Sequence, residues 1–75
     1  SSDDPPMTDL CGRVCTRFER CAPGPGDPDA NARACAETCR RGRQDQPGSP
    51  VYEFNRCYAE LPCGASYAPC DALLR

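Results

Sequence analysis

Apolar residues and cysteines recur with the spacing of an α-helix in the first third of the chain. From residue 10 they fall mostly three or four positions apart, and the residues between them are mostly polar. This pattern predicts a helix with one apolar side, which Thr8 or Asp9 is placed to cap. Three prolines and two glycines in residues 21–28 exclude helix, so a turn follows. The apolar positions are Leu10, Cys11, Val14, Cys15, Phe18 and Cys21.

A second helical stripe follows this turn. Asp27 is a good N-cap, and Pro28 suits the first helical position, where its missing N–H costs nothing. Two arginines end the stripe where the helix dipole favours cations, and Gly42 is placed as the C-terminal cap. The sequence therefore predicts a helix over residues 28–41. Its buried side consists of Ala32, Cys35, Ala36 and Cys39.

Two shorter helices are predicted after a polar linker over residues 42–49. Pro50 restarts a helical pattern, which ends at Pro62 and Gly64. Ser66 is placed to cap a last short helix, and no segment shows the alternation of a β-strand. The fold class predicted is all-α, a small disulfide-rich bundle with a helical hairpin and two shorter C-terminal helices. The stripe positions of these last helices are Val51, Phe54, Cys57, Tyr58 and Leu61, then Tyr67, Cys70, Leu73 and Leu74.

Eight cysteines in 75 residues are the strongest feature of the composition. Apart from cysteine and alanine the chain has twelve apolar residues, too few for a core that orders the whole chain. Four disulfides are expected to supply the missing stability. Because disulfides persist in oxidising compartments, we expect an extracytoplasmic protein, which is secreted, periplasmic or located at a cell surface.

The first residues of the chain define the expected domain organisation. Residues 1–8 are small, polar and acidic, which predicts a flexible leader before a single cysteine-rich domain over residues 9–75. The polar start is interpreted as that of a mature or trimmed form, and no transmembrane run is expected, so export is inferred from the cysteines. The leader also suits a tether behind the lipidated cysteine of a bacterial lipoprotein, upstream of Ser1. The use of Arg without Lys fits a GC-rich bacterial source.

Helical geometry narrows the pairing of the cysteines. The first helix carries Cys11 and Cys15 one turn apart on one side, and the second helix carries two cysteines in the same way. In antiparallel helices joined by a tight turn, the inner cysteines face each other and so do the outer ones. The predicted disulfides are Cys15–Cys35 and Cys11–Cys39.

Four cysteines remain, and three pairings of them are open. If the last two helices fold back at Cys63, then Cys57 and Cys70 are about equally far from the turn and face each other. Cys63 is then left for Cys21, because a third helix antiparallel to the second ends beside the end of the first. The preferred interpretation is Cys57–Cys70 and Cys21–Cys63.

Two segments carry a resemblance to a known group of proteins, Cys11-Gly12-Arg13-Val14-Cys15 and Cys35-Ala36-Glu37-Thr38-Cys39. They resemble the twin-CX3C helical hairpins of plant α-hairpinin peptides and small mitochondrial intermembrane chaperones. The resemblance covers about 29 of 75 residues and implies the same nested disulfides. Those families include protease inhibitors, antimicrobial peptides and chaperones, so no single activity is implied. This chain differs in its longer gap between the motifs, its turn rich in Pro and Gly, and its four further cysteines.

Catalytic chemistry finds no support in the residue types. The chain has no His, so a Ser/His or Cys/His relay cannot form, and the carboxylates fall on predicted polar helix sides. Thiolates four residues apart on facing helices suit Zn²⁺ or Cu(I), which leaves a thiolate metal-binding protein as an alternative. The even cysteine number and the lack of a CxxC knuckle favour disulfides. We therefore expect no enzyme, no metal site and no cofactor.

A basic middle region is the main candidate for binding. Residues 10–43 carry seven Arg against four acidic residues, although the net charge of the chain is −2. Three of these arginines are predicted on one exposed side of the first helix and three after the second helix, where they suit an acidic surface of a partner protein. Nucleic acid is not expected, because the net charge is negative. The candidate partner-binding residues are Arg13, Arg17, Arg20, Arg40, Arg41, Arg43 and Tyr52, which is predicted to be exposed.

The function predicted from these features is a non-catalytic exported binding or structural module that engages an unidentified protein partner. A protease inhibitor is a further alternative, in which Arg41 or Arg43 enters a protease pocket from a loop that neighbouring disulfides hold in order.

Overall fold

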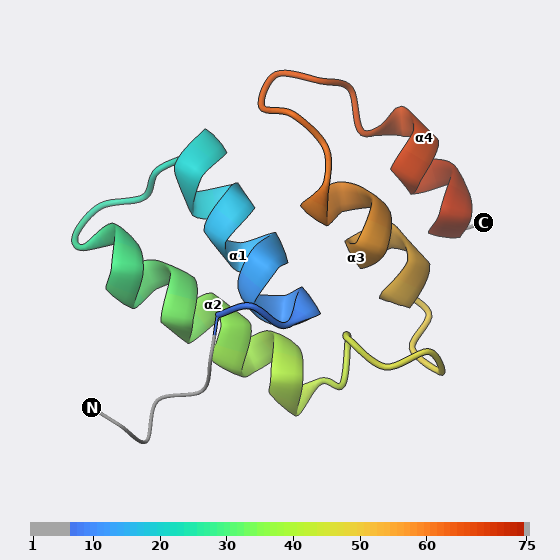
Figure 1. Ribbon diagram of the computed structural model, residues 1–75, viewed down its shortest axis with the longest axis horizontal. Helices are drawn as coiled ribbons and strands as arrows, with labels where there is room; N and C mark the ends of the chain where they lie inside the picture. Colours follow the sequence, from blue (N-terminus) through green and yellow to red (C-terminus); the bar gives the residue numbers. More distant parts are fainter. Residues whose placement is uncertain (1–6, 75) are drawn as a thin grey trace.

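The computed structural model describes residues 7–74, which form an all-α fold without strands (Figure 1). The order of elements agrees with the helical hairpin and two shorter C-terminal helices expected from the sequence. The first six residues of the expected leader and Arg75 lie outside the described part. The elements are α1 (Leu10–Cys21), α2 (Pro28–Arg41), α3 (Tyr52–Ala59), α4 (Ala68–Asp71) and a 3₁₀ turn, η1 (Ala72–Leu74).

The starts of the two long helices are fixed by local chemistry. The Asp9 carboxylate caps α1 by accepting a hydrogen bond of 2.8 Å from the Gly12 N–H. Asp27 caps α2 by accepting from the Ala30 N–H at 3.3 Å, directly before Pro28. Both caps were predicted from the sequence.

The third helix is shorter than its stripe indicates. It begins at Tyr52, without a side-chain cap, and ends at Ala59, so Leu61 lies beyond it. The N-cap of α4 is Tyr67, not Ser66 as predicted, because the helix begins one residue later; the Ser66 hydroxyl still accepts a hydrogen bond of 3.2 Å from the Ala68 N–H.

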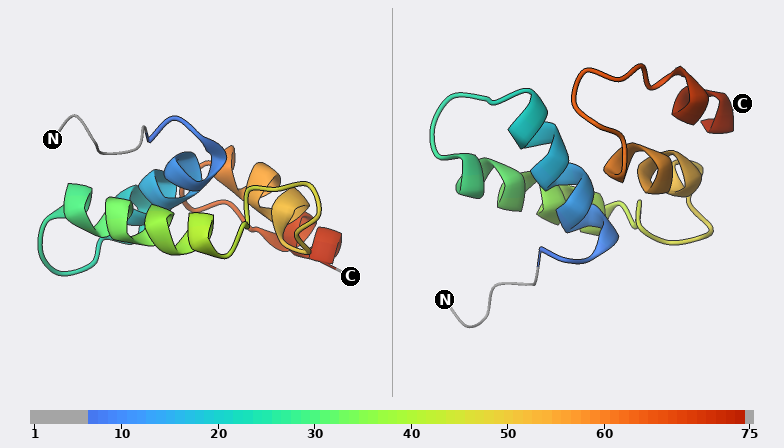
Figure 2. Two further views of the ribbon diagram at one scale, coloured as in Figure 1. Left: turned by 90° about the horizontal axis from the view of Figure 1, so that it is seen from below. Right: turned by 45° about the horizontal axis from the view of Figure 1, so that its top comes forward.

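The helices lie side by side in one layer. α1 packs against α2 on one side and α3 on the other, and α4 and η1 pack on α3 (Figures 1 and 2). The molecule measures 17 Å along its shortest axis, against 38 and 28 Å along the other two. α3 runs opposite to α2, as expected, but within the described residues it contacts α1 and not α2. Both broad faces of the plate are therefore open to solvent.

The core consists largely of sulfur and small side chains. Cys11, Cys15, Ala36 and Cys39 form a buried cluster between α1 and α2, and Met7 packs against it. Large apolar side chains lie outside: Phe18, placed by the sequence on the buried stripe, is 52% exposed. That expectation was wrong, because the α1–α2 interface is too narrow for an aromatic ring.

All eight cysteines are joined in the expected pairs. The Cα atoms of each pair are 5.3 to 5.7 Å apart, within the range that a disulfide requires. Two bridges staple α1 to α2, one attaches the segment after α3 to the end of α1, and one joins α3 to α4. The pairs are Cys11–Cys39, Cys15–Cys35, Cys21–Cys63 and Cys57–Cys70.

The entry of the chain into α1 depends on a glycine. A Cβ atom on Gly12 would lie 2.5 Å from the backbone of Met7, so only glycine allows the preceding segment to cross here. The packed part of the protein therefore includes Met7, one of the residues that the sequence analysis assigns to the leader.

Arg17 holds α3 against α1. Its Nε and Nη2 atoms donate hydrogen bonds of 3.0 and 3.1 Å to the carbonyls of Leu61 and Pro62, just beyond the end of α3. Its guanidinium carbon also lies 4.1 Å from the centre of the Tyr58 ring. The prediction that Arg17 is exposed was wrong, because α3 covers the side of α1 that carries it and leaves it 6% exposed.

We expect Arg17→Met to lower the free energy of unfolding by roughly 2 kcal/mol, because two charge-assisted hydrogen bonds between α1 and the end of α3 are lost. Denaturant unfolding with the disulfides kept oxidised measures the change. Arg13→Met is the matched control, since it removes the same charge from an exposed position of α1 and should change stability by less than about 0.5 kcal/mol. Equal effects of the two substitutions would contradict this role of Arg17.

Candidate interaction surface

The arginines proposed from the sequence do not form one patch. Arg13 and Arg20 are exposed on α1, seven residues apart and therefore on the same side of the helix. Arg41 is also exposed and pairs with Glu37 one turn earlier. Arg17 is buried under α3. The structure thus separates residues that the sequence analysis placed together.

Arg40 is engaged in a structural ion pair. Its Nε and Nη2 atoms donate hydrogen bonds of 2.8 and 2.9 Å to the two carboxylate oxygens of Asp9, which also caps α1. The hydrogen bonds from Arg40 hold the pKa of Asp9 below its usual value. Partial burial acts in the opposite direction and raises this pKa, while the hydrogen bond from the Gly12 N–H lowers it further. Asp9 likewise raises the pKa of Arg40. This pair ties the end of α2 to the start of α1.

Arg43 adopts a backbone conformation that usually requires glycine. The N–H of Gln44 donates to the carbonyl of Cys39, and that of Arg43 donates to the carbonyl of Arg40, both at 3.0 Å. These bonds form a Schellman motif, whose left-handed position is Arg43 with φ 53°. Gly42 is the cap residue, as predicted, but its φ is −81°. The left-handed conformation is therefore adopted by the next residue, Arg43.

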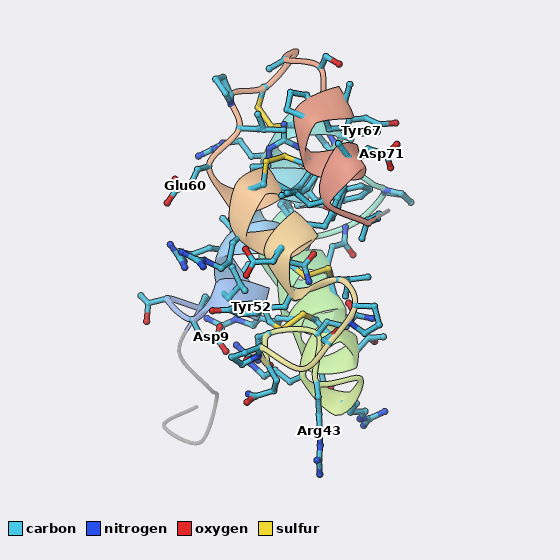
Figure 3. The ribbon with its side chains drawn as sticks, turned by 90° about the vertical axis from the view of Figure 1, so that its right-hand side faces the viewer. Asp9, Arg43, Tyr52, Glu60, Tyr67 and Asp71 are labelled. Atoms are coloured by element: carbon cyan, nitrogen blue, oxygen red, sulfur yellow. A yellow bond between two sulfur atoms is a disulfide. The ribbon has the colours of Figure 1, made fainter. Side chains whose placement is uncertain are left out.

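The Arg43 side chain extends from the end of the molecule that holds the C-terminus of α2 (Figure 3). It borders an open cleft of about 760 Å³ between this helix end and the linker to α3. The neighbouring Arg40 is neutralised by Asp9, and the N–H groups of Gly42, Arg43 and Gln44 already bond to α2 carbonyls. Arg43 is therefore the one cation among the described lining residues of the cleft that Asp9 does not pair, beside the uncharged side chains of Gln46 and Ser49.

Tyr52 is half-buried rather than exposed. The guanidinium carbon of Arg56 lies 5.7 Å from the centre of its ring, one turn along α3. The sequence prediction that its ring is fully available was therefore wrong, because the side chain of its own helix covers part of it.

A groove lined by aromatic side chains opens between α1 and α3. Its volume is about 410 Å³, and none of the described residues that line it is charged. The Phe54 and Tyr58 rings are stacked, with centres 5.6 Å apart and planes 15° from parallel. Phe18 and Tyr67 are 52% and 58% exposed. The lining residues are Val14, Phe18, Phe54, Asn55, Tyr58 and Tyr67.

Contacts behind the groove hold its walls in place. Asn55 is buried and donates a hydrogen bond of 3.0 Å to the Gln44 carbonyl, which anchors the linker to α3. Arg17 supports Tyr58 from α1. Tyr67 lies between two bridged cysteines, Cys63 and Cys70, which connect its loop to α1 and to α3.

The sequence analysis missed this groove. It assigned Phe18, Phe54 and Tyr58 to buried stripes, because helical periodicity shows which residues share a side but not whether another element covers that side. One signal in the sequence could have indicated the groove. The predicted stripes carry several aromatic residues, although their cysteines already fill the interfaces between the helices.

A second shallow pocket of about 430 Å³ lies at the turn between α1 and α2, beside Pro23 and Pro28. Glu19 organises this turn, since its Oε1 accepts hydrogen bonds of 3.0 Å from the Gly24 N–H and from the Asn31 side chain. This carboxylate therefore has a structural role.

Among residues 7–74, no three His, Cys, Asp or Glu side chains come together in a way that would hold a metal ion. All eight cysteines are in disulfides.

No helix in this part of the chain has the length and apolar character needed to cross a membrane.

The pair of Asp9 and Arg40 should make stability depend on pH. Because the folded pKa of Asp9 lies below its unfolded value of about 3.9, its stabilisation is present above that value and is lost as pH falls through the folded pKa. Asp9→Asn keeps a cap but removes the charge, so we expect a loss of about 1 kcal/mol near pH 7 that shrinks as the pH falls below about 3.9.

Denaturant unfolding of both proteins between pH 2 and pH 7 measures this difference. Asp29→Asn is the matched control, since it removes a carboxylate from an exposed pair with Arg33 and should have a smaller effect. A difference for Asp9→Asn that does not change with pH would exclude an ionic contribution.

Arg43→Gly should raise the free energy of unfolding by about 1 kcal/mol, because glycine adopts the left-handed conformation without steric cost. Arg41→Gly removes the same charge from the last turn of α2 and should lower stability by a similar amount. Thermal unfolding of both variants compares them. A loss of stability for Arg43→Gly would show that its side chain outweighs the backbone strain.

Comparison of the chain with models of protein families, with curated proteins and with solved structures gives no match. The resemblance to twin-CX3C hairpins therefore rests on the residues of the two motifs.

Proposed function

We propose that this protein is a non-catalytic, disulfide-rich binding module that engages a partner protein outside the cytoplasm. The observation that carries the proposal is the aromatic groove between α1 and α3. Four disulfides in a described chain of 68 residues suit an oxidising compartment, which is the secreted, periplasmic or cell-surface location expected from the sequence. Attachment as a bacterial lipoprotein belongs to the same proposal.

The groove has the properties of a protein-binding surface. Phenylalanine and tyrosine are enriched at interfaces, because they bury a large area with few rotatable bonds. Here Phe18 and Tyr67 are more than half exposed on opposite walls, although the core has too few large apolar residues. Cross-links fix both walls, so a partner loses little conformational entropy by ordering them.

The arginines take a secondary place in this proposal. Arg17 and Arg40 serve the fold, through the carbonyls after α3 and through Asp9. Arg13 and Arg20 lie about 140° and 160° around α1 from Phe18, at roughly 100° per residue. They therefore suit contacts with acidic groups on the other face of the plate, away from the groove.

The twin-CX3C resemblance supports the scaffold rather than an activity. The nested bridges Cys11–Cys39 and Cys15–Cys35 have the arrangement that it implies. The groove, however, depends on α3 and on the loop with Tyr67, both outside the two motifs. We therefore propose membership of that group of hairpins only as an account of how the α1–α2 scaffold arose and is stabilised.

The two alternatives receive less support. Arg41 lies in the last turn of α2 and Arg43 is left-handed, whereas a peptide enters a protease cleft in an extended conformation. A thiolate metal carrier needs free cysteines, and the structure pairs all eight.

A photo-crosslinking amino acid placed at residue 18 tests the proposed surface. We expect it to capture one defined protein in an extract of the extracytoplasmic fraction, whereas the same group at residue 34, exposed on α2 and outside the groove, should not. An excess of unlabelled wild-type protein should abolish capture, and an excess of the Phe18→Ser variant should not. Identical capture from both positions, or equal competition by the variant, would contradict a partner at the groove.

A further inference from the structure

We propose that the groove binds an uncharged, proline-rich segment of the partner protein in the extended polyproline II conformation. This inference rests on the proposed function, because it names the chemistry that the same surface recognises.

The electrostatics of the groove favour an uncharged occupant. None of its lining residues carries a charge, and Arg17, the cation beside Tyr58, donates its hydrogen bonds to the carbonyls of Leu61 and Pro62. A charged side chain that enters the groove would lose its water without gaining a counter-charge.

The hydrogen-bonding groups of the groove favour an occupant that accepts bonds and needs to donate few. Five of the six lining residues lie in α1 or α3, where backbone carbonyls point along the helix toward its next turn. The polar groups that remain are the Asn55 amide, whose Nδ2 already donates to Gln44, and the hydroxyls of Tyr58 and Tyr67, which donate as well as accept. Among residues 7–74, neither hydroxyl has a hydrogen-bond partner.

Proline matches this set of groups. It has no backbone N–H, so it leaves no donor unsatisfied in a groove that is poor in acceptors. Its carbonyls accept hydrogen bonds, which tyrosine hydroxyls donate. A peptide rich in other residues would bury N–H groups without partners, unless it entered as a helix.

The aromatic residues of the walls favour a polyproline segment over a helical peptide as the occupant. Helical ligands lie in hydrophobic trenches with their apolar face down, whereas polyproline helices dock on grooves lined by aromatic rings. Four of the six lining residues are aromatic and only Val14 is aliphatic. The nearly parallel Phe54 and Tyr58 rings form a ridge against which pyrrolidine rings pack. A polyproline helix is also extended before it binds, so its ordering costs little.

Titration of ¹⁵N-labelled, fully oxidised protein with synthetic peptides tests the proposal. The probes are a ten-residue peptide of repeated Ala-Pro-Pro, the same peptide with alanine in place of proline, and a leucine-rich amphipathic helix. We expect saturable chemical-shift changes with the proline peptide alone, at amides of residues 14–18, 54–58 and 67.

Variants of the groove should weaken this binding selectively. Phe18→Ala is expected to reduce affinity roughly tenfold, and Tyr67→Phe, which keeps the ring and removes only the hydroxyl, several-fold. Leu73→Ala is the control, because Leu73 is an exposed apolar residue of η1 outside the groove lining and should leave affinity unchanged. The Tyr67→Phe variant retains the fold even if Phe18→Ala disturbs it, so the test does not depend on one substitution.

Three results would overturn the inference. Equal binding of the alanine peptide, binding of the helical peptide in preference to the proline peptide, or concentration-dependent self-association through the groove would each assign it a different occupant. If the peptides fail while residue 18 still crosslinks one protein specifically, the inference is wrong and the proposed function stands. If both fail, the groove is not a binding surface.

Discussion

The two disulfides between α1 and α2 are the constraint on which the rest of the structure depends. Both hold their Cα atoms 5.7 Å apart, and the small side chain of Ala36 fills the space between them. An interface this narrow admits sulfur and methyl groups but no aromatic ring. The larger apolar side chains of α1 are therefore displaced toward α3, where Phe18 and Val14 become one wall of the groove.

The attachment of α3 shows how a chain with few apolar residues builds its second interface. Two disulfides, one buried arginine and one buried asparagine hold α3 and its loops, and each polar group has its hydrogen-bond partners. Because these directional contacts hold α3 in place, one side of its aromatic rings is not packed against another element and lines the groove. The same residues that stabilise the plate thus position Tyr58 and Tyr67 in the lining of the groove.

Local features of the structure could be predicted well from the sequence, because they depend on neighbours in the chain. The caps at Asp9 and Asp27 and the bounds of α2 follow from residue type and position. Helical periodicity also restricts the pairing of cysteines, since residues four apart share one side. Arg43 shows where this reasoning fails, because the glycine beside it suggested a different left-handed residue.

The sequence by itself therefore determined the helical segments, the caps at Asp9 and Asp27 and the two disulfides between α1 and α2, and it left three pairings for the other four cysteines. Only the tertiary structure decided which stripe residues are covered, because that depends on whether a distant helix packs there. Arg17 became buried because α3 took its place against α1 rather than α2, and Phe18 stayed half exposed because the α1–α2 interface has no room for its ring. Periodicity gives the direction in which each side chain points, while function depends on what lies in that direction.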